Sequence, residues 1–155
     1  MRIRTLILLG AAFVAGAVAG LNAAPAARKL AKQFLNVNRE KPPGYTHVVT
    51  SAPGKMIFIS GAGGAGPDGN LPSDFSAQAK NTFQRLKQYL ALAGADFKDV
   101  VKSNYYVTDM ANTAALRQVR AQYLDMDHPP ASTLVQTGLG PGLMLEVEAV
   151  AMIPE

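Results

Sequence analysis

The sequence predicts an α+β domain in which two helices cover one face of a mixed β-sheet. Three features predict it: two short β-branched runs open the domain, two segments with helical apolar spacing follow, and further β-branched or aromatic runs stand between and after them. The expected order of elements is ββαβαβ(β), the bracketed strand depending on whether a short run before the last strand is regular. Two helices leave the second face of such a sheet bare. We expect that face to pack against other copies of the chain.

The opening strands are predicted at residues 46–51 and 55–60. Ala52-Pro53-Gly54 between them is typical of a turn, so an antiparallel hairpin is the simplest arrangement. Ser73 is the predicted N-cap of the first helix, which ends at Gly94 because glycine is favoured just after a helix. One apolar stripe runs along this helix at steps of three and four, formed by Phe75, Ala79, Phe83, Leu86, Leu90 and Ala93.

The second half of the domain repeats these patterns. Residues 100–108 are rich in Val and Tyr and predict a third strand, and residues 112–124 predict a second amphipathic helix. Two more strands are expected at 132–137 and 143–153, on either side of a glycine-rich segment.

Residues 1–26 have the pattern of a signal peptide or an N-terminal membrane anchor. Arg2 and Arg4 precede a run without charge from Thr5 to Leu21, and Ala24-Pro25-Ala26 supplies the small residues that a signal peptidase needs. The run is slightly short for a spanning helix, which favours cleavage, and membrane contact is expected only if the leader is retained. Residues 27–41 are predicted to be a basic linker and residues 42–155 the domain, which would then be periplasmic or secreted.

Charge and composition limit the partners of the domain. The whole chain has a formal net charge of +4, but residues 42–155 carry eight Lys and Arg against ten Asp and Glu, a net of −2. Such a domain does not suit binding to a phosphate backbone, so no nucleic-acid partner is expected. The chain has no cysteine, and His47 and His128 are isolated in sequence, so we expect neither a metal nor a cofactor.

Residues 61–66 match the GxGxxG pattern of dinucleotide-binding loops. Such a loop leads directly into a helix, whereas here residues 67–70, Pro-Asp-Gly-Asn, intervene with turn chemistry of their own. We interpret the segment as a flexible connection whose glycines let a ligand approach the backbone.

A pair of acidic residues, Glu146 and Glu148, stands on the last predicted strand. The spacing of two places both carboxylates on one face, where one would act as a general base towards water in a dry site. A solvated strand edge is the alternative interpretation.

From Gly44 to Met152 the chain resembles the RidA family, also called YjgF or the L-PSP endoribonuclease family. The resemblance covers essentially the whole predicted domain. It is carried, in this order, by IFISG at 57–61, LAGA at 92–95, DVVK at 99–102, YVTDM at 106–110, PPAST at 129–133 and LEVEAVA at 145–151.

The resemblance implies a chorismate-mutase-like fold and a homotrimer with small-molecule clefts between its subunits. It also implies hydrolysis of imines and enamines, such as 2-iminobutanoate, to an oxo acid and ammonia. In that chemistry a glutamate positions water, an arginine pairs with the substrate carboxylate and a tyrosine closes the cleft. By this resemblance Glu146 is the catalytic residue. The ligand-binding positions are Tyr45, Ser60, Gly61, Ala131 and Ser132.

Ala131 departs from the family pattern because it stands at the arginine position. Alanine has no charge and no donor, whereas each hydrogen bond to a charged group is worth about 1.5–3 kcal/mol. We therefore expect an extracytoplasmic protein that binds or hydrolyses a small, neutral or weakly polar metabolite. The alternatives are an active 2-iminobutanoate or 2-iminopropanoate deaminase that uses another cation, and an endoribonuclease or RNA-associated factor.

Overall fold

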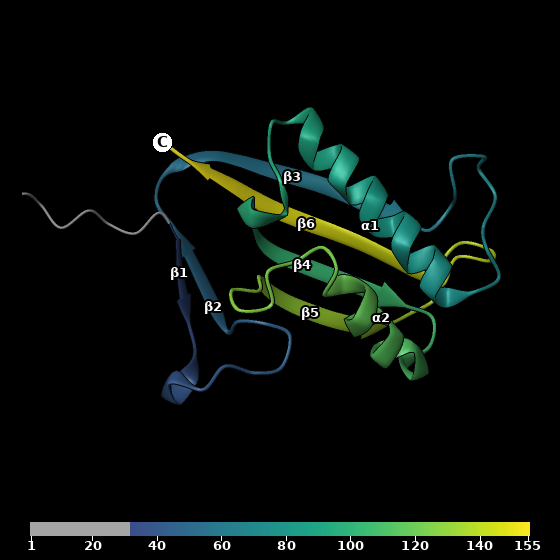
Figure 1. The fold of residues 1–155 in the computed structure, drawn as a ribbon, viewed down its shortest axis with the longest axis horizontal. Coiled ribbons are helices and arrows are strands. Elements are labelled where there is room, and N and C mark those ends of the chain that lie inside the picture. Colours follow the sequence, from purple (N-terminus) through teal and green to yellow (C-terminus); the bar gives the residue numbers. More distant parts are fainter. Residues whose placement is uncertain (1–31) are drawn as a thin grey trace, which may run out of the picture.

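A computed structural model describes residues 32–155 of the chain (Figure 1). The predicted signal peptide or anchor at 1–26, and residues 27–31 of the predicted linker, lie outside the described residues. Within the described part, neither helix combines the length and the apolar character needed to cross a bilayer.

The main sheet has four strands in the order β3-β6-β4-β5. β3 is Gly54–Gly63, β4 is Val100–Val107, β5 is Ala131–Gln136 and β6 is Leu145–Pro154. β6 pairs antiparallel with both β3 and β4, whereas β4 and β5 run parallel. The predicted mixed sheet is therefore confirmed, and all three strands predicted after the first helix are present.

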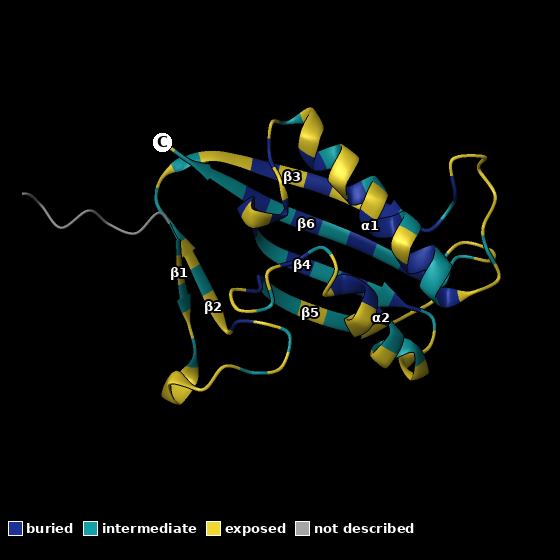
Figure 2. Cartoon of the chain, viewed as in Figure 1, coloured by how far each residue is buried: buried dark blue, intermediate teal, exposed yellow. Residues whose placement is uncertain are grey.

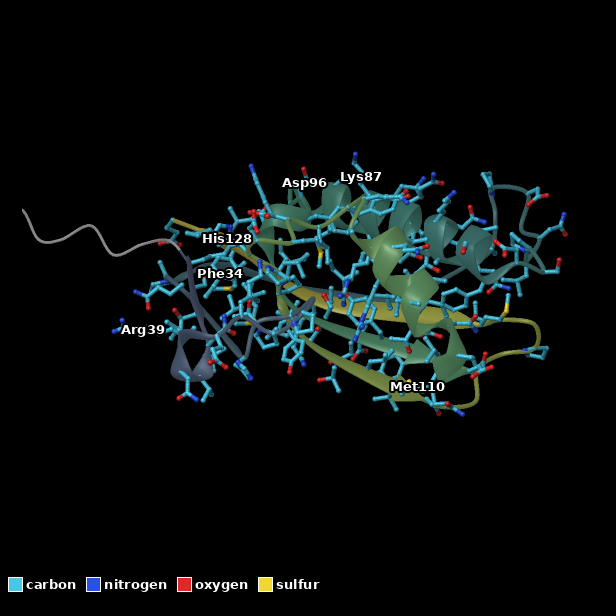
Figure 3. All side chains as sticks on the ribbon, turned by 60° about the horizontal axis from the view of Figure 1, so that its bottom comes forward. Phe34, Arg39, Lys87, Asp96, Met110 and His128 are labelled. Carbon is cyan, nitrogen blue, oxygen red and sulfur yellow. The ribbon has the colours of Figure 1, made fainter. Side chains whose placement is uncertain are left out.

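Two helices lie on one face of this sheet, α1 (Phe75–Leu92) and α2 (Thr113–Arg120). Both stand in front of the strands in Figure 1 and above them after the rotation in Figure 3. Short 3-10 turns at Val37–Arg39, Phe97–Asp99 and Met110–Asn112 complete the elements. The predicted second helix at 112–124 is shorter in the structure, because residues after Arg120 continue as turns.

The core forms where the apolar stripe of α1 meets the sheet. Five of the six predicted stripe residues, all except Ala93, are buried, and alternate residues of β4 and β6 face them. Phe83 lies at the centre, with ring centroids 5.1 Å from Tyr123, 6.2 Å from Phe97 and 6.5 Å from Tyr105. This aromatic cluster joins both helices to the sheet.

The predicted hairpin between residues 46–51 and 55–60 is wrong. β2 (Val48–Ser51) pairs instead with β1 (Lys32–Leu35) in a separate two-stranded sheet, and β3 pairs with β6 over nearly its whole length. Pro53 has no N–H to donate to a ladder, and β3 buries Ile57, Ile59 and Ala62 in the core beside β6. Pairing with the longer, core-facing strand therefore wins over pairing with the sequence neighbour.

Two local predictions also need correction. The cap of α1 is Asp74 and not Ser73, because the Asp74 carboxylate accepts a hydrogen bond of 2.7 Å from the N–H of Ala77. Part of the segment 27–41, predicted as a linker, forms β1, whose residues alternate between half-buried and exposed. The strand was not predicted because it is short and lies in a segment rich in Lys and Arg.

The second face of the main sheet has no helix over it among residues 32–155. Phe58 and Met56 on this outer face keep 76% and 55% of their surface exposed, and Figure 2 shows exposed segments along β3. Apolar side chains of this size favour a covering partner.

Candidate functional site

The outer face of the main sheet carries the polar side chains of the candidate site. On β4, Ser103, Tyr105 and Val107 point into the core, so the alternate residues Lys102, Asn104 and Tyr106 lie on the outer face. These three residues were not among the predicted site residues, although their alternation with mostly apolar neighbours along the predicted strand at 100–108 could have placed them on this face. Lys102 and Asn104 line a hollow of about 280 Å³ together with Phe58, Ser60 and Glu148.

Glu148 is held by its neighbours on β4. Its carboxylate accepts hydrogen bonds from Asn104 Nδ2 at 2.7 Å and from the Tyr106 hydroxyl at 2.8 Å. These two bonds lower the pKa of Glu148 and keep it ionised. A carboxylate with a lowered pKa and two hydrogen-bond donors is a weaker base than a free one, which favours Glu146 over Glu148 as the general base.

We expect replacement of Asn104 by Ala to raise the pKa of Glu148, because the larger of the two lowering contacts is lost. The native pKa lies below that of the unfolded chain. The carboxylate therefore stabilises the fold at pH values above the unfolded pKa, and that contribution disappears as the pH falls through the native pKa. NMR titration of the side-chain carboxyl carbon measures the shift.

Asn112→Ala is the matched control for this titration, because the side chain of Asn112 makes no capping bond at the start of α2. A Glu148 titration curve that is the same in Asn104→Ala and in the unaltered protein would contradict the assignment.

Glu146 contrasts with Glu148 on the same strand. Within residues 32–155 its carboxylate has no hydrogen-bond or ion-pair partner, and it lies over the backbone of Gly61 so closely that a Cβ at Gly61 would collide with it. Ser60 and Gly61 lie at a register shift between Ile59 and Ala62 and have no partner on β6. The structure thus brings together three of the predicted site residues: Ser60, Gly61 and Glu146.

Ala131 lies elsewhere on the outer face, at the start of β5. It is the register partner of Lys102, whose ammonium donates a 2.7 Å hydrogen bond to the Thr133 hydroxyl. Lys102 therefore places a cation on the face where the arginine of the family pattern would stand.

Ala131 and Glu146 do not meet within one chain. Ala131 pairs with Lys102, and Glu146 pairs with Tyr106 four residues further along β4, which is about 13 Å of strand. A small ligand cannot contact both positions unless a second copy of the chain supplies one of them.

Tyr45 and Ser132, the remaining predicted residues, lie near the sheet edge formed by β5. Tyr45 is 37% exposed, and its ring meets that of His47 edge-on, with centroids 5.6 Å apart. Ser132 is the register partner of the buried Ser103, so its side chain points to the helix side of the sheet, opposite to Ala131. Both residues line a smaller cavity with Arg117 and Arg120.

Among residues 32–155, no three His, Asp or Glu side chains are grouped in a way that would hold a metal ion.

The protein is thus of the α+β class, and its candidate site lies on the face of the main sheet that the helices do not cover. Comparison with known proteins gives the family: residues 39–153 match the family model described as Endoribonuclease L-PSP. The chain is 31% identical over 110 residues to Protein DfrA of Myxococcus xanthus, covering 70% of this chain and 84% of that protein. It is 26% identical over 125 residues to 3-aminoacrylate deaminase RutC of Acinetobacter baylyi, covering 79% and 98%.

The solved structure of YyfB from Yersinia pestis, a protein of the Rid family, is similar with a TM-score of 0.68 and 30% identity. The match covers 80% of this chain and all of that one. The chain belongs to the RidA/YjgF family, and its fold is chorismate-mutase-like, as the sequence predicted.

Proposed function

We propose that this protein is an extracytoplasmic hydrolase of small imines or enamines. Its substrate would lack the carboxylate that an arginine at position 131 binds in the family pattern. One observation carries the proposal: the carboxylate of Glu146 lies free over Gly61 on the outer sheet face, while position 131 is alanine. The family relative named 3-aminoacrylate deaminase supports the class of chemistry. The leader pattern at residues 1–26 supports the location.

The proposed reaction assigns one role to Glu146. Its carboxylate accepts a proton from water while the water oxygen attacks the carbon of a protonated C=N bond. The proton then passes from Glu146 to the nitrogen of the carbinolamine. As the C=O bond forms and the C–N bond breaks, the hydroxyl proton returns to the Glu146 carboxylate and from there to water, and ammonia leaves with the carbonyl product. The exposed backbone of Ser60 and Gly61, outside the β6 ladder, would orient the substrate beside the carboxylate.

The proposed cleft lies between subunits of a homotrimer. Two observations support it: about 13 Å of strand separates the levels of Ala131 and Glu146 in one chain, and the outer face exposes Phe58 and Met56. Packing outer faces together would bury these side chains and bring the start of β5 of one subunit near Glu146 of another.

The test is ammonia release from enzymatically generated 2-iminobutanoate by the full-length protein, measured above the spontaneous rate. We expect the unaltered protein to be near background and Ala131→Arg to be at least tenfold faster. The new guanidinium would hold the substrate carboxylate through hydrogen bonds worth about 1.5–3 kcal/mol each. Light scattering on the same samples should give the mass of three chains.

Ala121→Arg is the control, because it adds an arginine at an exposed residue beyond α2 and should give no gain. If Ala131→Arg is as slow as this control in a correctly assembled sample, the outer face is not a hydrolytic cleft of this kind.

Lys102 favours a second candidate, an active 2-imino acid deaminase. Its ammonium lies on the outer face beside Ala131 and would pair with a substrate carboxylate as a single point charge. In that case the unaltered protein releases ammonia well above background, and Lys102→Gln abolishes the activity. Inactivity of the unaltered protein would reject this candidate and leave the first.

A further inference from the structure

A second cavity, of about 170 Å³, lies on the helix side of the main sheet. It is bounded by residues 43–45, by α2, and by Tyr105, Ser132 and Leu134 of β4 and β5. It shares no lining residue with the outer-face hollow. Tyr45 and Ser132, which the family resemblance assigns to ligand binding, line this cavity, but none of the residues that act in the proposed hydrolysis does.

Arg120 is buried beside this cavity without a charged partner. Arg120 is only 6% exposed, and its Nε makes no hydrogen bond. The ion pairs among residues 32–155 are Lys41–Asp127 and Asp125–His128, neither of which involves Arg120. Burying an unpaired charge costs several kcal/mol, so a counter-charge at this position would be strongly favoured.

The surrounding residues are shaped around the guanidinium. Its central carbon lies 5.4 Å from the centroid of the Tyr105 ring, a cation–π arrangement that suits a planar cation. Gly44 has a φ of +86°, and a Cβ at this position would collide with Nη2 of Arg120. Thr46 anchors this segment, because its hydroxyl donates to the carbonyl of Pro129 at 2.6 Å.

A second arginine reaches the same cavity from the solvent side. Arg117 is exposed, three residues before Arg120 on α2, and both line the cavity. Like charges at this spacing on a helix repel each other. An anion between the two guanidinium groups would remove the repulsion, and the Ser132 hydroxyl, which also lines the cavity, is a further donor.

We propose that this cavity binds a small oxyanion, held by Arg120 inside and by Arg117 at the mouth. The shared chemistry is that of carboxylate and phosphate groups, which accept paired N–H donors from guanidinium. The volume limits the ligand to a phosphate ion, a short carboxylate, or the anionic end of a larger molecule whose remainder leaves past Arg117.

The test is isothermal titration calorimetry of the full-length protein with inorganic phosphate and, separately, with acetate, in a buffer free of both. We expect saturable binding of one anion per chain. Binding of phosphate alone would identify a phosphate site, and binding of acetate alone would identify a carboxylate site. The absence of saturable binding with either anion would overturn the proposal.

Three variants assign the binding to this cavity. Arg120→Met should abolish it, Arg117→Gln should weaken it at least tenfold, and Lys87→Gln should leave it unchanged. Lys87 is a matched charge control because it is exposed on α1 and points away from the sheet (Figure 3). If Arg120→Met fails to fold, Arg117→Gln decides the question, since an exposed residue is readily replaced. Unaltered affinity in Arg117→Gln would overturn the proposal.

Discussion

Replacing Glu146 by Gln in the Ala131→Arg protein is expected to abolish the gain in ammonia release from 2-iminobutanoate and return it to the spontaneous background, because a general base usually contributes about 10²–10⁴-fold. Glutamine keeps the size of the side chain and its contact with Gly61 but cannot accept a proton from water. The effect should fall on kcat, because the carboxylate acts in the transition state and the substrate is held elsewhere. Initial rates over a range of imine concentrations separate kcat from KM.

Glu148→Gln is the control for this experiment. Glu148 lies two residues away on the same face, but its carboxylate is engaged by Asn104 and Tyr106. We expect this variant to lose less than tenfold. A larger loss in Glu148→Gln than in Glu146→Gln would reverse the assignment of the two carboxylates.

Phe83→Ala is expected to lower the free energy of unfolding by about 3–5 kcal/mol, the range for a fully buried phenylalanine. Phe83 is 1% exposed and contacts three other aromatic rings, from the segment after α1, from β4 and from the turn after α2. Truncation leaves a cavity at the point where the helices meet the sheet, and rigid aromatic neighbours cannot collapse into it. Urea unfolding followed by circular dichroism measures the change.

Leu92→Ala is the comparison for this variant, because Leu92 is 87% exposed at the end of α1 and should change the free energy of unfolding by less than about 0.5 kcal/mol. Equal losses in the two variants would mean that the aromatic cluster is not the centre of the core.

Local patterns were enough to predict most elements of this protein. The step of three and four between Phe75 and Leu90 places those side chains on one side of a helix in any fold, and Gly94, with a φ of +76°, ends that helix as expected. The same kind of argument placed Glu146 and Glu148 together on one face of a strand, which the structure confirms. The family resemblance, and the alanine at position 131, were likewise readable from the residues themselves.

Strand pairing was beyond local patterns. The partner of β3 depends on which long strand completes the core, and β6 lies some 90 residues away in sequence. A period of two says which face a residue occupies but not which strand lies beside it. The predicted hairpin failed, and the short strand β1 was missed, for this reason.

The chemistry of the candidate site and of the second cavity also depends on the tertiary structure. The sequence alone determined which side chains the protein has: a glutamate at 146, an alanine at 131 and arginines at 117 and 120. Only the tertiary structure left Glu146 unpaired over Gly61, engaged Glu148, and buried Arg120 beneath Gly44. Hydrogen bonds and burial set the reactivity of a charged group, and both come from residues that are distant in sequence and close only once the chain has folded.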